Sequence, residues 1–375
     1  TLKVIDRSPN GRISGGRWSP DGRWVAYSYP NTPETRCLKL YDTKTRKTHQ
    51  ITEPVLADFA PAWDPDGKYL YFLGIRDLDP VYDSLHFDLN FPRGLRPYLI
   101  TLRKDLPSPF VPVPRAPGEK AEDADKKDEK PKGKKGKKKE TKPVEIDLDG
   151  IEHRIVAFPV PLGRYGQIAG LPGGKVLFTS FPVQGSLGRR WSDDEPAQGT
   201  LEMWDFDKQE KQTLLSSIGG FALSQDGKTM LYLSGRKLRA LKAGEKPDEK
   251  QEKAGPGRKS GWLDLGRVRV SVDPQAEWRQ MYREAWRLQR DHFWTADMSK
   301  VDWQRVYRRY LPVLERVGAR SEFSDLMWEM QGELGTSHAY EMGGDYRAKP
   351  VYTVGHLAAE LRYDRRARGF RVVHV

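Results

Sequence analysis

The 375-residue sequence predicts a mainly β chain, because short alternating strands separated by glycine-containing turns fill its first 271 residues. The strands also recur as copies of one pattern. Near residue 272 the period changes, and apolar side chains then return every three or four residues, as on a helix. We therefore expect a repeated β unit over 1–271, a small helical unit over 272–347 and the start of a second β unit over 348–375.

Four segments share the order strand, glycine turn, and aromatic or aliphatic strand. Asp-Gly between such strands is a strong hairpin signal, because both residues tolerate positive φ. The first two copies begin at Arg17 and Ala62, a spacing of about 45 residues that is expected for one four-stranded propeller blade. The repeats therefore predict a β-propeller. The copies are RWSPDGRWVAYSY (17–29), AWDPDGKYLYFLG (62–74), GLPGGKVLFTS (170–180) and ALSQDGKTMLYLS (222–234).

A lysine-rich insertion at about 118–142 separates the second copy from the third. It holds eleven Lys against seven acidic residues and contributes part of the net charge of +12. Because it has no aromatic and almost no aliphatic side chains, it cannot bury enough surface to fold, and we expect a disordered loop. Nucleic acid is not expected as a partner, because aromatic side chains for base stacking are missing from this basic tract.

Other composition signals limit the possible functions. The single cysteine, Cys37, excludes an internal disulfide framework and is expected to be a small buried residue on a strand. No run of eighteen apolar residues occurs, so no membrane span is expected. Gly227-Lys228-Thr229 lacks the upstream glycine of a phosphate-binding loop, and no Gly-x-Ser-x-Gly or His-Glu-x-x-His motif is present. We expect neither a cofactor nor a metal site.

Three helices are expected after residue 272. The first starts at Asp273-Pro274, an Asp cap followed by Pro in the first turn. The second runs from about Asp302 to Val317, with Gly318 as its stop and a bend at Pro312. The third runs from about Ser321 to Gly335.

The stretch from Gly332 to Glu341, GELGTSHAYE, follows the third helix and carries the candidate catalytic residues, Ser337 and His338. Adjacent residues cannot easily serve as nucleophile and base to each other, because each needs its own approach to the reacting atom. The functional interpretation makes His338 a general base for a nucleophile elsewhere, with Ser337 positioning a partner. The alternative is a structural or surface Ser-His pair.

GELGTSHAYE, together with WRQMYREAWRLQRDHFW upstream, resembles the first catalytic-core segment of tricorn proteases, large serine peptidases that trim peptides. The propeller repeats resemble those of tricorn and of TolB-type proteins. The tail, GHLAAELRY and GFRVVHV, resembles the opening of a PDZ domain. The resemblance implies a fragment with part of the second propeller, the first core lobe and the start of the PDZ domain.

For this chain the resemblance implies a peptidase whose propeller filters or guides peptide substrates. His338 would be the general base and Ser337 a supporting residue that hydrogen-bonds to a glutamate. The nucleophilic serine, the oxyanion hole and that glutamate would lie beyond the end of this sequence, so the chain alone would be inactive. A homo-oligomer is also implied. The cytoplasm is the expected compartment, with the periplasm as the alternative.

Two other functions stay open at this point. A non-catalytic propeller that binds proteins or peptides would account for the repeats and the basic insertion, but not for the helices that lead into the Ser-His turn. A carboxy-terminal processing protease has a related core, and the propeller argues against it.

Overall fold

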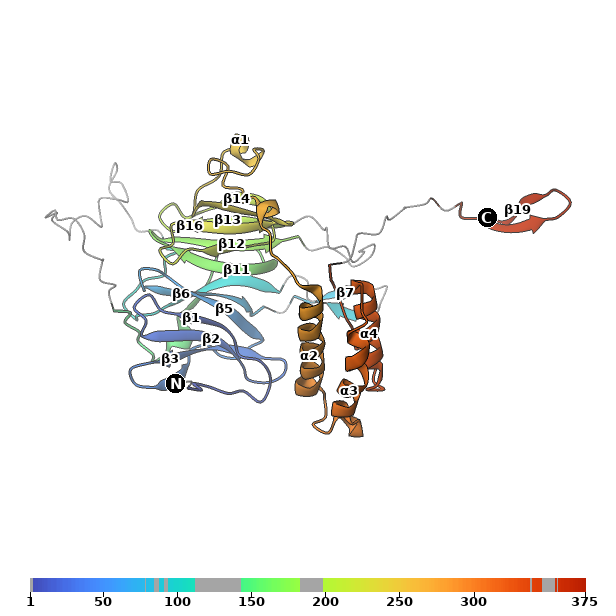
Figure 1. Ribbon diagram of the computed structural model, residues 1–375. Helices are drawn as coiled ribbons and strands as arrows, with labels where there is room; N and C mark the ends of the chain where they lie inside the picture. Colours follow the sequence, from blue (N-terminus) through green and yellow to red (C-terminus); the bar gives the residue numbers. More distant parts are fainter. Residues whose placement is uncertain are drawn as a thin grey trace. The chain divides into compact units, whose positions relative to one another are not determined.

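The computed structural model describes residues 3–77, 79–83, 88–90, 94–111, 143–182, 198–337, 339–345, 355 and 357–375. The chain divides into two compact units, Thr1–Val268 and Arg269–Val375. Strands dominate the first unit, and three longer helices dominate the second (Figure 1). The lysine-rich insertion predicted at 118–142 lies outside the described residues, and the domain boundaries predicted at 271 and 347 stay predictions.

The first unit is built of antiparallel β-sheets that follow one another along the chain, from blue to yellow in Figure 1. They are the blades of a propeller, as the repeats predicted. A single parallel pairing, Arg36 with Ala57, joins the first two blades into one sheet. The strands are β1 (Ser14–Trp18), β2 (Trp24–Pro30), β3 (Arg36–Asp42) and β4 (Lys47–Gln50); β5 (Ala57–Trp63), β6 (Tyr69–Ile75), β9 (Leu95–Thr101) and β10 (Ile155–Ala157); β11 (Arg164–Leu171), β12 (Lys175–Phe181), β13 (Gly199–Asp205) and β14 (Glu210–Ile218); and β15 (Gly220–Leu223), β16 (Thr229–Ser234) and β17 (Lys237–Lys242).

Short elements complete the first unit. A small hairpin pairs β7 (Val81–Asp83) with β8 (Asp88–Asn90). Backbone bonds from Ala240 N to Gly261 O and from Leu263 N to Leu238 O add the 261–263 stretch to the edge of the fourth blade. The remaining helical turns are η3 (Ile151–His153), α1 (Glu249–Glu252) and η4 (Leu265–Arg267).

The Asp-Gly turns of the repeats differ in detail from the prediction, whereas Gly173 and Gly174 of the third copy both have positive φ as expected. In the first blade Gly22 has φ 72°, but Asp21 does not have positive φ, so this is not a two-residue turn with two left-handed residues. Instead, Ser19 closes a longer loop, because its backbone N–H donates to Trp24 O at 2.8 Å and its hydroxyl donates to Asp21 Oδ1 at 2.5 Å. Ser224 and Asp226 repeat this arrangement in the fourth blade.

The second blade has Asp64 where the first has Ser19. Asp64 accepts the backbone N–H of Lys68 at 3.0 Å through Oδ2. It is buried, and desolvation raises the pKa of its carboxyl to about 6. The same turn thus holds a titratable group in one blade and a neutral hydroxyl in another.

The first strands of successive blades contact one another: β1 contacts β5, β5 contacts β11, and β11 contacts β15. Side chains bond across these contacts. The Ser28 hydroxyl donates to Asp58 O at 2.7 Å, and the Trp63 indole N–H donates to Arg17 O at 3.0 Å. The Gln167 amide both accepts from Phe221 N at 2.7 Å and donates to Phe221 O at 3.1 Å. Such bonds fix the register of one blade against the next.

Apolar side chains fill the spaces between blades. One cluster includes Trp24, Leu38 and Phe72, a second includes Tyr71, Phe158 and Phe178, and a third includes Leu177, Leu201 and Met230. Cys37 is fully buried on β3, as the sequence predicted, and burial raises the pKa of its thiol.

The second unit contains α2 (Pro274–His292), η5 (Met298–Lys300), α3 (Trp303–Leu314) and α4 (Arg320–Gly332). The predicted cap is confirmed, because the Asp273 side chain accepts the Ala276 N–H. The predicted end of α3 is three residues too late. The chain leaves the helix after Leu314 through a tighter turn, in which Val317 N donates to Leu314 O.

The three helices share one core. The indoles of Trp286 and Trp303 each donate to the other residue's carbonyl, at 2.8 and 2.9 Å, and so tie α2 to the start of α3. The Tyr282 hydroxyl donates to Tyr307 O at 2.8 Å. The buried members of this core are Trp278, Tyr282, Met298, Trp303, Val306, Leu314, Val317, Phe323, Leu326, Met327, Met330 and Leu334.

The tail forms a hairpin of β18 (Glu360–Asp364) and β19 (Gly369–His374), as the pattern of strand, Arg-rich turn and strand predicted. Leu361 pairs with Val372 and Tyr363 with Phe370, so one face of the hairpin is apolar. The PDZ-like character of 348–375 stays a prediction. Within the described part of the chain, no helix is long and apolar enough to cross a membrane.

Candidate functional site

The candidate site begins where α4 ends. Met330 and Leu334 bury the last turn of the helix in the core. The backbone then turns at Gly335, which has φ 59° and so adopts the left-handed conformation that glycine favours. Gly335 N donates to Gly332 O at 3.0 Å, which closes the turn. This confirms Gly335 as the helix stop, although α4 itself ends at Gly332.

Glu333 anchors this turn to α3. Its carboxylate accepts the Tyr310 hydroxyl at 2.7 Å and Arg309 Nη1 at 2.5 Å. The hydrogen bonds from Tyr310 and Arg309 lower the pKa of the Glu333 carboxyl. Burial, and then the hydrogen bond to Glu333, raises the pKa of the Tyr310 hydroxyl. The residues that follow Gly335 therefore start from a point that is fixed on the helical core.

We call residues 336–345 the exit segment. At its start the Thr336 hydroxyl donates to Leu334 O at 3.2 Å. Further on, the Tyr340 ring meets the Trp328 ring edge-on, with centroids 6.4 Å apart. Because Trp328 lies in the middle of α4, the chain has turned back toward the start of that helix.

The next residue, Glu341, reaches the first turn of α4. Its Oε1 accepts Arg320 Nη2 at 2.6 Å and the Ser324 hydroxyl at 2.9 Å. Arg320 Nη1 also donates to the Ser324 hydroxyl oxygen, at 2.5 Å. The side chains of Arg320 and Glu341 are only 12% and 17% exposed, so this ion pair is largely shielded from solvent.

Arg320 makes two more contacts. Its Nε lies 3.2 Å from Asp345 Oδ1, at the far end of the exit segment. Its guanidinium carbon lies 5.2 Å from the centroid of the Phe323 ring, and that ring stacks on Trp278 of α2. The arginine therefore lies between the helical core and the exit segment. We call Arg320, Ser324, Glu341 and Asp345 the arginine clamp.

Ser337 lies in the exit segment and is exposed. His338 lies outside the described residues, so its predicted role as a general base stays a prediction. The structure brings Ser337 between two anchors, Glu333 on α3 and Glu341 on α4. Thr336 and Tyr340, which flank the Ser-His pair in sequence, both have contacts with α4 or its exit turn.

The sequence analysis missed Arg320 and Ser324. One signal could have pointed to them. An arginine in the first turn of a helix is unfavourable beside the positive end of the helix dipole, where acidic residues are preferred. A cation in that position needs another partner, and here the partners lie 21 and 25 residues further along the chain, at 341 and 345.

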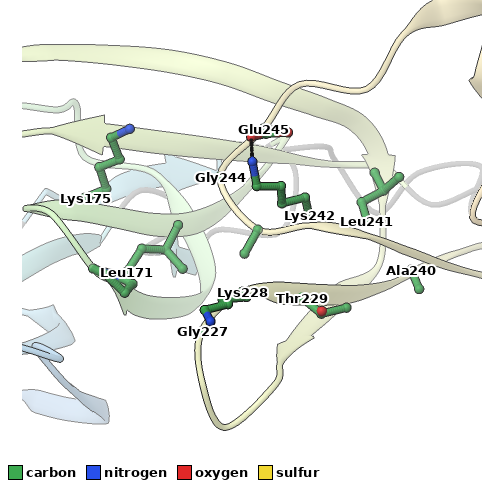
Figure 2. A pocket seen from close by; sticks show the side chains of 12 residues that line it. Leu171, Lys175, Gly227, Lys228, Thr229, Ala240, Leu241, Lys242, Gly244 and Glu245 are labelled. Carbon is green, nitrogen blue, oxygen red and sulfur yellow. Dashed lines mark hydrogen bonds and ion pairs between the residues drawn. The ribbon is translucent and has the colours of Figure 1, made fainter. Parts of the chain in front are cut away.

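Two hollows open in the propeller unit. The larger has a volume of about 620 Å³ and lies between the turns of the third and fourth blades (Figure 2). Lys175, Lys228 and Lys242 line it, but Lys242 pairs with Glu245, as Figure 2 shows, and the other two lie near Asp205 and Asp226. The neighbouring carboxylates offset the lysine charges, so the hollow is not a dedicated anion site.

The smaller hollow, about 370 Å³, lies between the second and third blades, and its lining includes Asp64, Tyr69 and Phe206. Among the described residues no three His, Cys, Asp or Glu side chains gather so that they could hold a metal ion. Neither hollow offers a group with a clear chemical role.

A family model for the second β-propeller domain of tricorn protease matches residues 1–244. This match covers more than half of the chain. The chain belongs to the tricorn protease family. A second family model, for the tricorn protease C1 domain, matches residues 274–332, from the start of α2 to the end of α4.

Individual tricorn proteins agree with this assignment. The chain is 41% identical over 342 residues to tricorn protease homolog 1 of Streptomyces coelicolor, covering 90% of this chain and 31% of that protein. It is 35% identical to the tricorn protease homolog of Saccharolobus solfataricus, covering 100% of this chain and 32% of that protein. The chain thus spans about a third of these relatives.

A solved structure, the crystal structure of the tricorn protease, superposes with a TM-score of 0.76 at 28% identity. The superposition covers 96% of this chain and 33% of that one. The likeness to the tricorn structure therefore extends over nearly the whole chain.

Proposed function

We propose that this chain is part of a serine-type peptidase of the tricorn kind and that His338 supplies its general base. The observation that supports this most is that residues on both sides of His338 are held on the helices, Glu333 on α3 and Glu341 on α4, in a chain whose relatives are named tricorn proteases. A general base must stay within hydrogen-bond reach of the proton it removes, so a held segment suits this role. Ser337 is proposed as a supporting residue.

The nucleophile is proposed to lie outside residues 1–375. His338 and Ser337 are neighbours in sequence and do not form a pair of base and nucleophile by themselves. The proposed substrates are peptides, which the propeller would filter or guide, and the proposed assembly is a homo-oligomer. The proposed compartment is the cytoplasm, with the periplasm as the alternative.

The test compares peptide turnover by the complete gene product with that of His338→Ala and Ser337→Ala variants. A general base contributes about 10²- to 10⁴-fold, so His338→Ala should lower kcat by at least about a hundredfold with little change in melting temperature. Ser337→Ala should cost less. His292→Ala, which changes an exposed histidine at the end of α2, is the control and should leave kcat unchanged.

If His338→Ala turns over peptides as fast as the His292→Ala control does, the proposal is wrong. If His338→Ala unfolds the helical unit, then the histidine is structural rather than catalytic. Equal and complete losses for Ser337→Ala and His338→Ala would mean that Ser337 takes part directly in the chemistry.

The chain of 1–375 alone should not react with a serine-directed fluorophosphonate probe, because a base without its nucleophile has nothing to activate. Stoichiometric labelling of a serine in this chain, abolished by His338→Ala, would place the nucleophile within it and contradict the fragment proposal.

A further inference from the structure

Each of the three guanidinium nitrogens of Arg320 has a partner within the protein. Nη1 donates to Ser324, Nη2 donates to Glu341, and Nε lies 3.2 Å from Asp345. The guanidinium is 12% exposed and lies over Phe323. Because protein groups already occupy each of its nitrogens, it is not placed to bind the carboxylate of a peptide. Its hydrogen bonds and ion pairs are made with other residues of the same chain.

The partners of Arg320 show what it holds. Ser324 is on the same helix, but Glu341 and Asp345 both belong to the exit segment. The packing of α4 on α2 and α3 depends instead on apolar side chains such as Phe323, Met327 and Met330. Arg320 therefore contributes little to joining the helices and mainly attaches the exit segment to them.

Distances along the chain show how strongly this attachment constrains the segment. Ser324 and Gly332 lie about 12 Å apart along the axis of α4, at 1.5 Å per residue. The six steps from Gly335 to Glu341 reach at most about 20 Å when extended. The same six steps in a helix would cover only about 9 Å. The chain between the two anchors can therefore span at most about 20 Å.

We propose that Arg320 is the positioning residue of the site: through Glu341 and Asp345 it fixes residues 339–345, which directly follow the proposed base in sequence. This inference rests on the proposed function for its catalytic consequence. The planar fork of arginine is required, because it makes separate bonds in fixed directions, which the single ammonium of lysine cannot reproduce.

The first arm of the test measures position without activity. Nitroxide labels are attached in chain 1–375 at Met342→Cys, in the exit segment, and at Arg283→Cys on α2, in a Cys37→Ala background. Both label positions are exposed. We expect a narrow distance distribution that loses its narrow peak in Arg320→Gln and Glu341→Gln. The matched control is Arg279→Gln, which removes an exposed arginine–glutamate pair between α2 and α3 and should keep the peak.

The second arm measures turnover in the complete gene product. Arg320→Gln should lower kcat about tenfold to a hundredfold, since a misplacement of about 1 Å can cost that much. KM should stay within about twofold, because uniform binding of substrate is untouched. Arg320→Lys should lie between wild type and Arg320→Gln, and Arg279→Gln should match wild type.

The outcomes separate the two proposals. Unchanged distance distributions in both Arg320→Gln and Glu341→Gln would overturn the positioning role. If the enzyme is active and Arg320→Gln has the same kcat as Arg279→Gln, the positioning role is also overturned. If the wild-type gene product turns over no peptide, the proposed function fails, and the distance measurement alone decides the role of Arg320. If Arg320→Gln does not fold, the milder Glu341→Gln variant decides it.

Discussion

The propeller unit and the helical unit each contain a shielded arginine–carboxylate pair that lies against an aromatic ring. In the propeller, Arg76 binds Asp58 through Nε at 3.0 Å and Nη2 at 2.5 Å and lies over Phe72. In the helical unit, Arg320 binds Glu341 and lies over Phe323. The chemistry of the two pairs is alike, but what they hold together is different.

Asp58 and Arg76 lie at the neighbouring ends of β5 and β6, which backbone bonds already pair. Removing Arg76 leaves the backbone pairing of β5 with β6 in place, but it leaves the buried Asp58 carboxylate without its partner. We therefore expect a loss of stability. Glu341 lies in an irregular segment without a ladder. Losing Arg320 frees that segment, so we expect the effect on function. The comparison teaches that the same kind of ion pair stabilises the propeller unit and positions a segment in the helical unit.

The largest effect on stability is expected for Arg76→Met. Asp58 has a side chain only 3% exposed, and burial raises the pKa of its carboxyl despite the neighbouring arginine. Removing one partner of a buried pair costs about 3–5 kcal/mol, because the other charge is left uncompensated. Urea unfolding of chain 1–375 measures the loss. In the exposed Arg279→Met control the loss should be much smaller, because a solvent-exposed ion pair contributes little to stability.

Adding Asp58→Asn to Arg76→Met should recover part of the lost stability, because the uncompensated charge is then gone. A loss below about 1 kcal/mol for Arg76→Met alone would break the comparison, since the propeller pair would then be as weak as a surface pair.

The next effect concerns Asp64 and pH. Its pKa is raised to about 6 in the folded chain, against an unfolded value near 3.9. The folded state therefore binds the Asp64 proton more tightly than the unfolded state does. The contribution of protonated Asp64 to the free energy of unfolding is fully present below about pH 4 and is lost as pH rises through about 6. The difference corresponds to about 2–3 kcal/mol.

Asp64→Asn removes this titration but keeps an oxygen that can accept the Lys68 N–H. We therefore expect the variant to be less pH-dependent than wild type between about pH 4 and 8, by about 2–3 kcal/mol. Urea unfolding across this range measures it. Parallel stability curves for the two proteins would mean that Asp64 ionises normally in the folded blade.

A smaller effect is expected at the first anchor of the exit segment. Gly335→Ala places a side chain at φ 59° and should cost about 1–2 kcal/mol. Gly332→Ala is the matched control, because Gly332 lies in α4 with open space around its Cβ position, and it should be neutral or stabilising by up to about 1 kcal/mol. Thermal unfolding of the two variants compares them, and equal losses would contradict a special turn at 335.

The smallest effect is expected for deletion of residues 119–142. The tract has almost no apolar side chains to lose from a core, so the melting temperature should change by no more than a few degrees. A larger decrease would show that the insertion packs on the propeller.

Local rules predicted much of this structure. The Asp273 cap, the stop at Gly335 and the buried position of Cys37 follow from residues close in sequence, and the structure has all three. The end of α3 was misjudged because a tighter turn after Leu314 closes the helix before Gly318 is reached. Such a turn depends on the packing of Leu314 and Val317, which the glycine rule ignores.

The arginine clamp could not be predicted in the same way. Arg320 and Glu341 stand 21 residues apart and meet only because the chain turns at Gly335 and runs back along α4. Asp64 is a second example. It occupies the same buried place in its blade as Ser19, and burial, together with the neighbouring Asp66, raises the pKa of its carboxyl to about 6.

The central claim is that the exit segment presents the general base of a serine-type peptidase. The most direct test is stoichiometric labelling of the complete gene product by a fluorophosphonate probe, in wild type and in His338→Ala. We predict that one serine is labelled in wild type and that His338→Ala loses the labelling while keeping its melting temperature, because the serine is then no longer activated. Equal labelling of a folded His338→Ala variant would contradict the claim.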